Sequence, residues 1–304
     1  MLSLSDIEAA RDRVEDVALE TTLKPQRTFS RMSGADVRLK FENTQRTGSF
    51  KIRGATNRIR KLSDAEREGG VITASAGNHA QGVALAAQHS DVDALIVMPE
   101  FAPISKVNAT RSYGAEVELY GEDYADAQER AHELAGETDR TYVHAYEDQA
   151  VQAGQGTIGL EIVEACPEVE TVVVPIGGGG LISGIATAVK ERKPETRVIG
   201  VQAEGAATVA YSLDKGATEE LDSVDTIADG IATGAVGENT LPIIEERVDE
   251  IVAVSDSQIA SAMVLLLERA KTLVEGAGAV PIAALLEDAF EYHEDEVIVP
   301  VLSG

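Results

Sequence analysis

The chain contains, at residues 47–54, the sequence Thr47-Gly48-Ser49-Phe50-Lys51-Ile52-Arg53-Gly54, directly after a strand-like run at residues 37–41. One lysine, Lys51, stands here among small and hydroxylated residues, at a turn from strand to helix. Ligands commonly collect at such turns, at the end of a sheet. If burial lowered the pKa of its amine, Lys51 could attack a carbonyl group. The alternative is a solvated lysine in the first turn of a helix, which is the usual situation of an arbitrary lysine.

Outward from this stretch, short apolar runs alternate with helical patterns. We expect strands at residues 71–74, 94–98, 116–120, 171–174, 197–203, 251–254 and 297–301. We expect helices at about residues 52–62, 77–88, 104–113, 124–134, 150–165, 257–271 and 279–290, with one more capped by Ser5 or Asp6 and another from the glycine run to Lys193. Continuous apolar strands that alternate with helices predict largely parallel sheets covered on both faces. A chain of 304 residues has room for so many units in two lobes. The predicted fold class is therefore α/β, with two lobes that each hold a mostly parallel twisted sheet flanked by helices.

The net charge is −26, because 52 Asp and Glu residues face only 26 Lys and Arg residues. The acids are spread over the whole length, and their mutual repulsion opposes compaction unless salt screens it. We interpret this as adaptation to a salt-rich cytoplasm; the alternative is an ordinary acidic enzyme. The same charge argues against a nucleic-acid partner, which requires basic surface.

Cellular location is indicated by what the sequence lacks. The only cysteine is Cys166, so an intrachain disulfide is excluded. The first twenty or so residues do not resemble a signal peptide, and no apolar run is long enough to span a bilayer. We expect a cytoplasmic protein without a membrane partner.

A glycine run, Gly177 to Gly180, follows the expected strand at 171–174 and precedes a helix. Its backbone amides can converge on an anion, and the helix directs its positive dipole end to the same place, which is typical of a phosphate site. A dinucleotide fingerprint is not met, because its last glycine position falls on Ile182 or Ser183. One feature still favours a dinucleotide: Glu204 lies about 20 residues further on, where an acid would bind the ribose.

A second turn, Ser75-Ala76-Gly77-Asn78-His79, offers a hydroxyl, an amide, an imidazole and free N–H groups at a helix start. Such a group suits a carboxylate, and Asn78 could donate to a phenolate-like oxygen. Ser and Asn are also routine helix caps, so this turn alone is a weak signal.

Together these segments resemble the pyridoxal-phosphate enzymes of the tryptophan-synthase β fold, and most closely the threonine (serine) dehydratases. The resemblance rests on residues 47–55, 75–81 and 175–184, and continues in order through 228–232, 274–279 and 302–304. It covers the chain from about Thr22 to the last residue. It implies a lyase that converts L-threonine to 2-oxobutyrate and ammonia, and L-serine to pyruvate, as in isoleucine biosynthesis. It also implies a homodimer or higher homo-oligomer. The expected domains are a large cofactor-binding domain (1–48 and 143–304) and a small mobile domain (49–142).

The resemblance also implies a role for each motif residue. Lys51 would hold the cofactor as a Schiff base and remove the Cα proton of the substrate. The other expected cofactor-binding residues are Phe50, Asn78, Gly177, Gly178, Gly179, Gly180, Leu181, Gly230, Glu275 and Ser303. The expected substrate-binding residues are Ser75, Ala76, Gly77, Asn78 and His79. Ser303, at the pyridine nitrogen, offers a hydroxyl rather than a carboxylate, which favours elimination over reprotonation.

The sequence departs from the family pattern at three places. Racemases of the family carry a second serine where this chain has Ala76, so a two-base racemase is disfavoured. Metal-binding members have an acid where this chain has Ala210, six residues after Glu204, so we expect no metal site. The chain stops at Gly304, which leaves Ser303 close to a terminal carboxylate that could fray and leaves no C-terminal regulatory domain.

Other functions stay open at this stage. Serine racemase or another amino-acid lyase of the same fold is the nearest alternative. A nicotinamide-dependent dehydrogenase would use the glycine run and Glu204, but not Lys51. A non-catalytic amino-acid sensor would have no need of the lysine.

Overall fold

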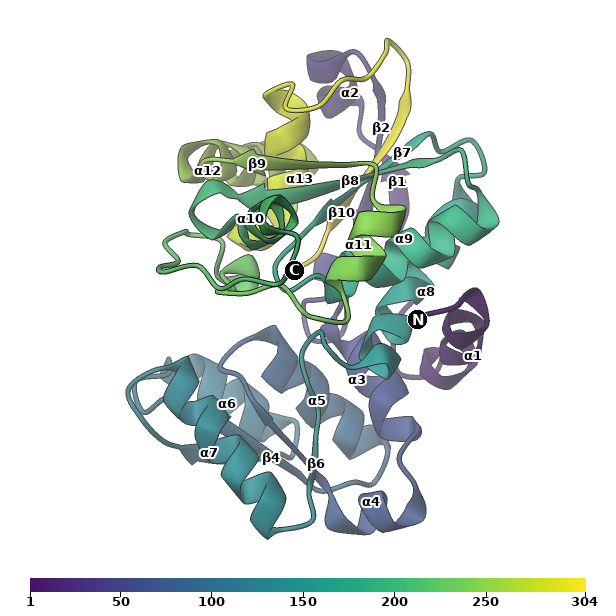
Figure 1. The fold of residues 1–304 in the computed structure, drawn as a ribbon. Helices are drawn as coiled ribbons and strands as arrows, with labels where there is room; N and C mark the ends of the chain where they lie inside the picture. Colours follow the sequence, from purple (N-terminus) through teal and green to yellow (C-terminus); the bar gives the residue numbers. More distant parts are fainter.

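The computed structural model describes residues 1–304, which form two lobes that follow one another along the long axis of the molecule, each with one β-sheet (Figure 1). The larger sheet has six strands in the order β1-β2-β10-β7-β8-β9. Their bounds are β1 Leu23–Pro25, β2 Asp36–Phe41, β10 Val297–Leu302, β7 Thr171–Pro175, β8 Arg197–Ala203 and β9 Glu250–Val254. Every neighbouring pair is parallel except β1 with β2.

The smaller sheet has four parallel strands in the order β5-β4-β3-β6. Their bounds are β5 Glu116–Leu119, β4 Ala94–Met98, β3 Val71–Ala74 and β6 Thr141–Tyr142. This sheet is built from one continuous part of the chain, whereas the six-stranded sheet is assembled from segments on both sides of it. Together the sheets confirm the predicted α/β class with two mostly parallel sheets.

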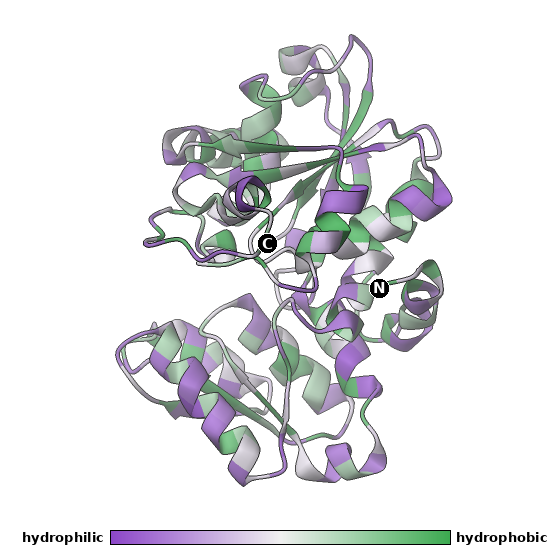
Figure 2. Ribbon diagram, viewed as in Figure 1, coloured by the Kyte–Doolittle hydropathy of each residue, from purple (hydrophilic) through white to green (hydrophobic).

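Helices cover both faces of each sheet. Their bounds are α1 Leu4–Val14, α2 Arg27–Ser33, α3 Lys51–Arg60, α4 Asp64–Gly69, α5 Asn78–His89, α6 Ile104–Ser112, α7 Tyr124–Glu137, α8 Gln149–Ala165, α9 Gly180–Arg192, α10 Thr208–Lys215, α11 Leu241–Arg247, α12 Asp256–Leu265 and α13 Gly276–Leu286. In β7, Val173 packs toward α13, while Val172 and Val174 pack toward α8 and α9. Two-sided burial of this kind is why the strands are continuously apolar, as the hydropathy colouring shows (Figure 2).

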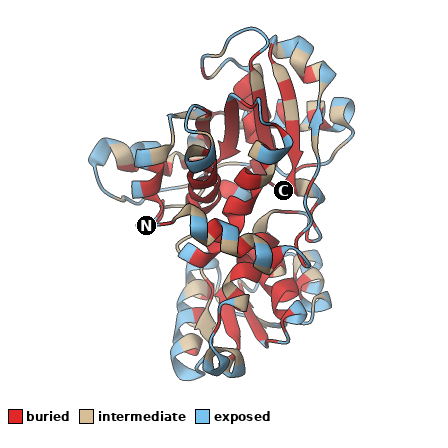
Figure 3. Ribbon diagram, turned by 90° about the vertical axis from the view of Figure 1, so that its right-hand side faces the viewer, coloured by how far each residue is buried: buried red, intermediate tan, exposed pale blue.

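Two helices, α3 and α8, lie where the lobes meet (Figure 1). They approach closely because glycines face each other: a Cβ at Gly54 would lie 2.4 Å from Gln155 Nε2, and one at Gly154 would lie 2.6 Å from the Arg53 carbonyl oxygen. The buried residues form a nearly continuous column through both lobes (Figure 3). The helix that begins at Lys51 is thus packed against a helix of the larger lobe.

Most predicted elements are present, with ends shifted by a few residues. Six short elements were not predicted from the sequence: α2, α4, α10, α11, β1 and β6. The helix expected at 257–271 is α-helical only to Leu265 and ends in a π-helical turn, Leu266–Ala270. The domain boundaries at residues 48/49 and 142/143 stay a prediction. None of the helices combines the length and apolar character that crossing a bilayer requires.

Candidate active site

A cavity of about 490 Å³ opens between the lobes at the carboxyl ends of the strands, the place where ligands bind in parallel sheets. It contains every site residue predicted from the sequence. These residues are Phe50, Lys51, Ser75, Ala76, Gly77, Asn78, His79, Gly177, Gly178, Gly179, Gly180, Leu181, Gly230, Glu275 and Ser303. Segments far apart in the sequence therefore converge on one site, although their individual roles stay predictions.

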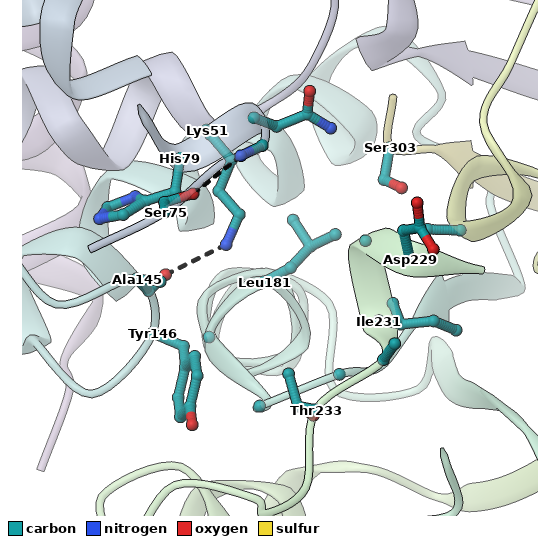
Figure 4. A pocket seen from close by; sticks show the side chains of 18 of the residues that line it. Lys51, Ser75, His79, Ala145, Tyr146, Leu181, Asp229, Ile231, Thr233 and Ser303 are labelled. Carbon is teal, nitrogen blue, oxygen red and sulfur yellow. Dashed lines mark hydrogen bonds between the residues drawn. The ribbon is translucent and has the colours of Figure 1, made fainter. Parts of the chain in front are cut away.

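Lys51 is the first residue of α3, and its side chain points into this cavity (Figure 4). Its Nζ donates to the Ala145 carbonyl oxygen at 3.2 Å and lies 5.2 Å from the centre of the Phe50 ring. No carboxylate forms an ion pair with it, and burial lowers the pKa of the Lys51 amine to about 8. A substantial fraction of this amine is therefore neutral near physiological pH, as a nucleophile or a base requires.

The asparagine loop lies at the start of α5, next to Lys51. Ser75 Oγ accepts from the Gly77 N–H at 3.1 Å, and His79 Nε2 lies 2.9 Å from the Val143 carbonyl oxygen. Burial and the nearby charge of Lys51 lower the pKa of His79 to about 3. His79 is thus neutral at pH 7, with Nε2 protonated and donating to Val143, and its buried Nδ1 has no partner. Asn78 Nδ2 donates to Glu275 Oε2 at 2.8 Å across the cavity.

The glycine run forms the opposite end of the site. Gly179 has a φ of +92°, a left-handed conformation that favours glycine, and α9 begins at the next residue. None of the backbone N–H groups from Gly177 to Ile182 donates to another protein atom. A Cβ at Gly178 would lie 2.5 Å from the Tyr146 ring, so only glycine fits against it. Free amides at a helix start form an anion site.

The end of the chain closes the third side. The Ser303 carbonyl oxygen accepts from the Phe50 N–H at 3.1 Å, and the Gly304 carbonyl oxygen accepts from the Glu275 N–H at 3.0 Å. Ser303 is only 4% exposed. The expectation that this end frays is therefore wrong, because two backbone hydrogen bonds hold it beside the Lys51 helix.

Several residues that line the cavity were missed from the sequence. They include Lys106, Tyr124, Ala145, Tyr146, Asp229 and Thr233. Tyr146 and Ala145 follow β6, a strand of two residues that is too short to recognise by pattern. Asp229 stands in a motif that was identified, between residues 228 and 232, so it could have been proposed with Gly230.

Glu204 does not line this cavity. It lies in a separate surface hollow together with Ala210 and Tyr211. The acid that favoured a dinucleotide is thus apart from the glycine run, which removes the main support for a nicotinamide-dependent dehydrogenase.

Comparison with known proteins gives the family. Residues 14–304 match the family described as pyridoxal-phosphate dependent enzyme. The chain belongs to this family. It is 50% identical over 286 residues to the L-threonine ammonia-lyase of Thermotoga maritima, covering 94% of this chain and 71% of that protein. It is 47% identical over 307 residues to a catabolic L-threonine dehydratase of Staphylococcus aureus, covering 100% and 89%.

Two solved structures share the whole fold. Threonine deaminase isoform 2 from Solanum lycopersicum, in its processed form, superposes with a TM-score of 0.96 at 42% identity, covering 99% of this chain and 88% of that one. Maize serine racemase superposes equally well, with a TM-score of 0.96 at 36% identity and coverage of 100% and 93%. The fold therefore does not separate a lyase from a racemase.

The cavity fits the cofactor of this family. The unbonded amides from Gly177 to Ile182 match a phosphate, and the Lys51 amine matches an aldehyde. Asn78 supplies an amide donor, and Ser303 supplies a hydroxyl. These donors line one cavity, so a single molecule could contact all of them.

Proposed function

We propose that this chain is a pyridoxal-phosphate-dependent L-threonine ammonia-lyase, which converts L-threonine to 2-oxobutyrate and ammonia and also accepts L-serine. The observation that carries the proposal is the position of Lys51, whose amine of lowered pKa faces the same cavity as the unbonded glycine amides. The relatives named for threonine support the substrate class, because they match nearly the whole chain at close to half identity.

Each residue does a defined task in this proposal. The electron sink for a carbanion at Cα comes from pyridoxal phosphate when it is bound. Amides from Gly177 to Leu181 would hold its phosphate group, Asn78 would donate to its ring oxygen, Ser303 would meet its pyridine nitrogen, and Phe50, Gly230 and Glu275 would line the ring. Ser75, Ala76, Gly77, Asn78 and His79 line the substrate side, where free N–H groups and the Ser75 hydroxyl receive the substrate carboxylate.

Lys51 removes the proton from Cα. Its neutral amine has a free electron pair for that proton, whereas its charged form has none. His79 is a poor candidate for this task, since its Nε2 donates to Val143 and its pKa of about 3 makes its Nδ1 a weak base. After the loss of the Cα proton, the β-hydroxyl leaves together with a proton as water. The resulting enamine becomes an imine, and one water molecule hydrolyses this imine to the 2-oxo acid and ammonia.

Serine racemase is the second candidate, because maize serine racemase has the same fold. The residue that argues against it is Ala76, which lines the cavity where racemases of this family place a second serine. A methyl group cannot return a proton to the opposite face of Cα. With Lys51 as the only base at Cα, elimination is favoured.

The test compares the unaltered protein with Lys51→Ala. The unaltered protein should be yellow, lose its colour on treatment with borohydride, and form 2-oxobutyrate from L-threonine. Lys51→Ala should lose the borohydride-sensitive colour and the turnover together, while Lys61→Ala, at an exposed residue of the same segment, should retain both. Normal turnover by Lys51→Ala would refute the mechanism. D-serine formed from L-serine at a rate near that of pyruvate would favour the racemase.

Broader features of the protein are also proposals. The net charge of −26 supports function in a salt-rich cytoplasm. Association into a homodimer would cover Val264, Leu267 and Leu273, which are apolar and 53–77% exposed near the end of α12. We also propose that the domain of residues 49–142 is mobile relative to the rest. A role in isoleucine biosynthesis and a catabolic role are both compatible with the reaction.

A further inference from the structure

A short turn, residues 144–148, carries the chain from β6 of the smaller sheet to α8 of the larger lobe. The imidazole ring of its first residue, His144, forms hydrogen bonds with the backbone of the turn. His144 Nδ1 accepts from the Tyr146 N–H at 3.2 Å and from the Glu147 N–H at 3.0 Å. These acceptor contacts to the second and third residues ahead are those by which Asx turns are closed. Since Nδ1 accepts, the ring proton of a neutral His144 is on Nε2.

The turn presents two groups to the active site. The Ala145 carbonyl oxygen accepts from Lys51 Nζ at 3.2 Å (Figure 4). Tyr146 packs on the glycine run, so that a Cβ at Gly180 would lie 2.8 Å from Tyr146 Cβ. Both residues line the cavity, whereas His144 does not.

The far end of the same turn is held by other contacts. Asp148 Oδ1 accepts from the Ala150 N–H at 2.7 Å and caps α8, while its other oxygen accepts from Arg58 Nε at 2.7 Å. Glu147 accepts from the Asn239 N–H at 3.1 Å. The start of the turn lacks these contacts. There, His144 Nδ1 accepts from the backbone N–H groups of Tyr146 and Glu147.

We propose that His144 is a positioning residue of the active site: its Nδ1 closes the turn that presents the Ala145 carbonyl oxygen to the Lys51 amine and the Tyr146 ring to the glycine run. The inference rests on the proposed function only in taking Lys51 as the catalytic amine. The Ala145 carbonyl oxygen gives the Lys51 amine a fixed hydrogen-bond acceptor, and this contact restricts the direction of the electron pair on Nζ. A shift of about 1 Å at such a contact can cost about a hundredfold in rate.

The surroundings keep His144 in the required state. Burial and the charge of Lys51 lower the pKa of His144 to about 4, against the opposing effect of Asp148. A protonated Nδ1 could not accept a hydrogen bond. Because His144 is neutral near pH 7, Nδ1 remains an acceptor and the turn stays closed at that pH. The ring also packs on its neighbours, with its centre 4.6 Å from that of Tyr146 and 6.1 Å from that of Tyr142. A purely structural role as a packed ring is therefore the competing explanation.

Two substitutions separate these explanations. His144→Asn keeps an acceptor, because its Oδ1 is as many bonds from the backbone as Nδ1, but it removes the ring. His144→Phe keeps an aromatic ring and removes the acceptor. We expect His144→Phe to lower kcat at least about tenfold with little change in KM, and His144→Asn to retain kcat within about threefold.

Two readouts do not depend on turnover. In the cofactor-free protein, the Tyr146 and Glu147 amides should exchange hydrogen faster in His144→Phe and near the unaltered rate in His144→Asn. Nitrogen NMR of the unaltered protein should show His144 with an unprotonated Nδ1. If the unaltered protein has no lyase activity, the proposed function fails while the exchange contrast still decides the role of His144.

The opposite ranking would overturn the proposal. The ring acts by packing alone if His144→Phe keeps the kcat and amide exchange rates of the unaltered protein, while His144→Asn has a lowered kcat and faster amide exchange. Equal amide exchange in both variants, or a protonated Nδ1 in the unaltered protein, would overturn it as well.

Discussion

Arg53 Nε donates to Glu42 Oε2 at 2.8 Å, and these two side chains are only 1% and 0% exposed. Arg53 lies two residues beyond Lys51 on α3, so the contact fixes the helix that carries the proposed catalytic amine. Its guanidinium also donates to Glu161 on α8, which in turn pairs with Lys40 on β2. Burial alone would raise the pKa of Glu42, but Arg53 and Lys40 outweigh it and lower that pKa. These four side chains form a network of buried and half-buried charges that joins α3 and α8 to β2 and the turn after it.

Breaking this network should destabilise the protein strongly. Arg53→Met removes the partner shared by Glu42 and Glu161 and leaves buried negative charge unpaired. We expect the free energy of unfolding to fall by about 3–5 kcal/mol, as for other buried ion pairs that lose one partner. Denaturant titration in molar salt measures it.

Arg11→Met is the matched control. It breaks the exposed pair of Arg11 with Glu164, whose side chains are 39% and 54% exposed, and should cost less than about 1 kcal/mol. Similar losses in the two variants would show that the buried network has no special weight.

The amine of Lys51 should titrate at a much lower pH than the amine of an ordinary lysine. With a pKa of about 8 instead of 10.5, it is mostly neutral above about pH 8. In the cofactor-free protein, the rate at which a small amine-directed reagent labels Lys51 should therefore reach half its maximum near pH 8. Peptide mass spectrometry over a series of pH values measures this rate, with the exposed Lys61 as the internal reference. A midpoint for Lys51 above pH 10 would contradict the proposed general base.

The glycine run should not tolerate a side chain where Tyr146 packs. Gly178→Ala places a Cβ 2.5 Å from the Tyr146 ring, so either the ring or the amides must move. We expect cofactor affinity to fall by about tenfold or more, equivalent to about 1.4 kcal/mol. Titration of the cofactor-free protein with pyridoxal phosphate, followed by absorbance, gives the dissociation constant. Gly136→Ala on α7, where a Cβ would meet no atom within 4 Å, is the control that should leave the constant unchanged.

Much of this site could be predicted because its residues are of unusual types. Lys51 among small residues, the glycine run and the asparagine loop each stand out in a linear sequence. The parallel topology then brings them together, since the loops after parallel strands meet at one edge. All predicted site residues accordingly line one cavity.

The parts that were missed depend on contacts distant in sequence. Ala145 is ordinary by type, and its carbonyl oxygen matters only because the turn after β6 meets Lys51, 94 residues away. Glu42 and Glu161 look like two acids among many, and only the folded chain shows that Arg53 pairs with both. The ordered end at Ser303 was also missed, because hydrogen bonds from Phe50 and Glu275 cannot be read from the last residues alone.

Acid should destabilise the fold through two histidines, His79, which is buried, and His144, which is half-buried. His79 and His144 have pKa values of about 3 and about 4, below the 6.5 of the unfolded chain. Below pH 6.5 the unfolded chain therefore binds more protons, so stability falls as the pH falls, from about 6.5 to about 4. Denaturant titrations across this range should show that the free energy of unfolding falls less steeply with pH in His144→Asn than in the unaltered protein, because the unfolded variant has no His144 to bind a proton. Identical slopes would show that His144 does not stay neutral in the fold.

Salt should stabilise this protein far more than a typical enzyme. The net charge of −26 repels itself in the compact state, and added ions screen that repulsion within about 3 Å at 1 M. We expect the free energy of unfolding to rise by at least about 2 kcal/mol between about 0.1 M and about 3 M potassium chloride, with most of the rise at the lower concentrations. Thermal unfolding in a series of potassium chloride concentrations measures it, and a parallel series in sorbitol separates charge screening from solute exclusion. A flat response to potassium chloride would show that the acidic surface is not an adaptation to salt.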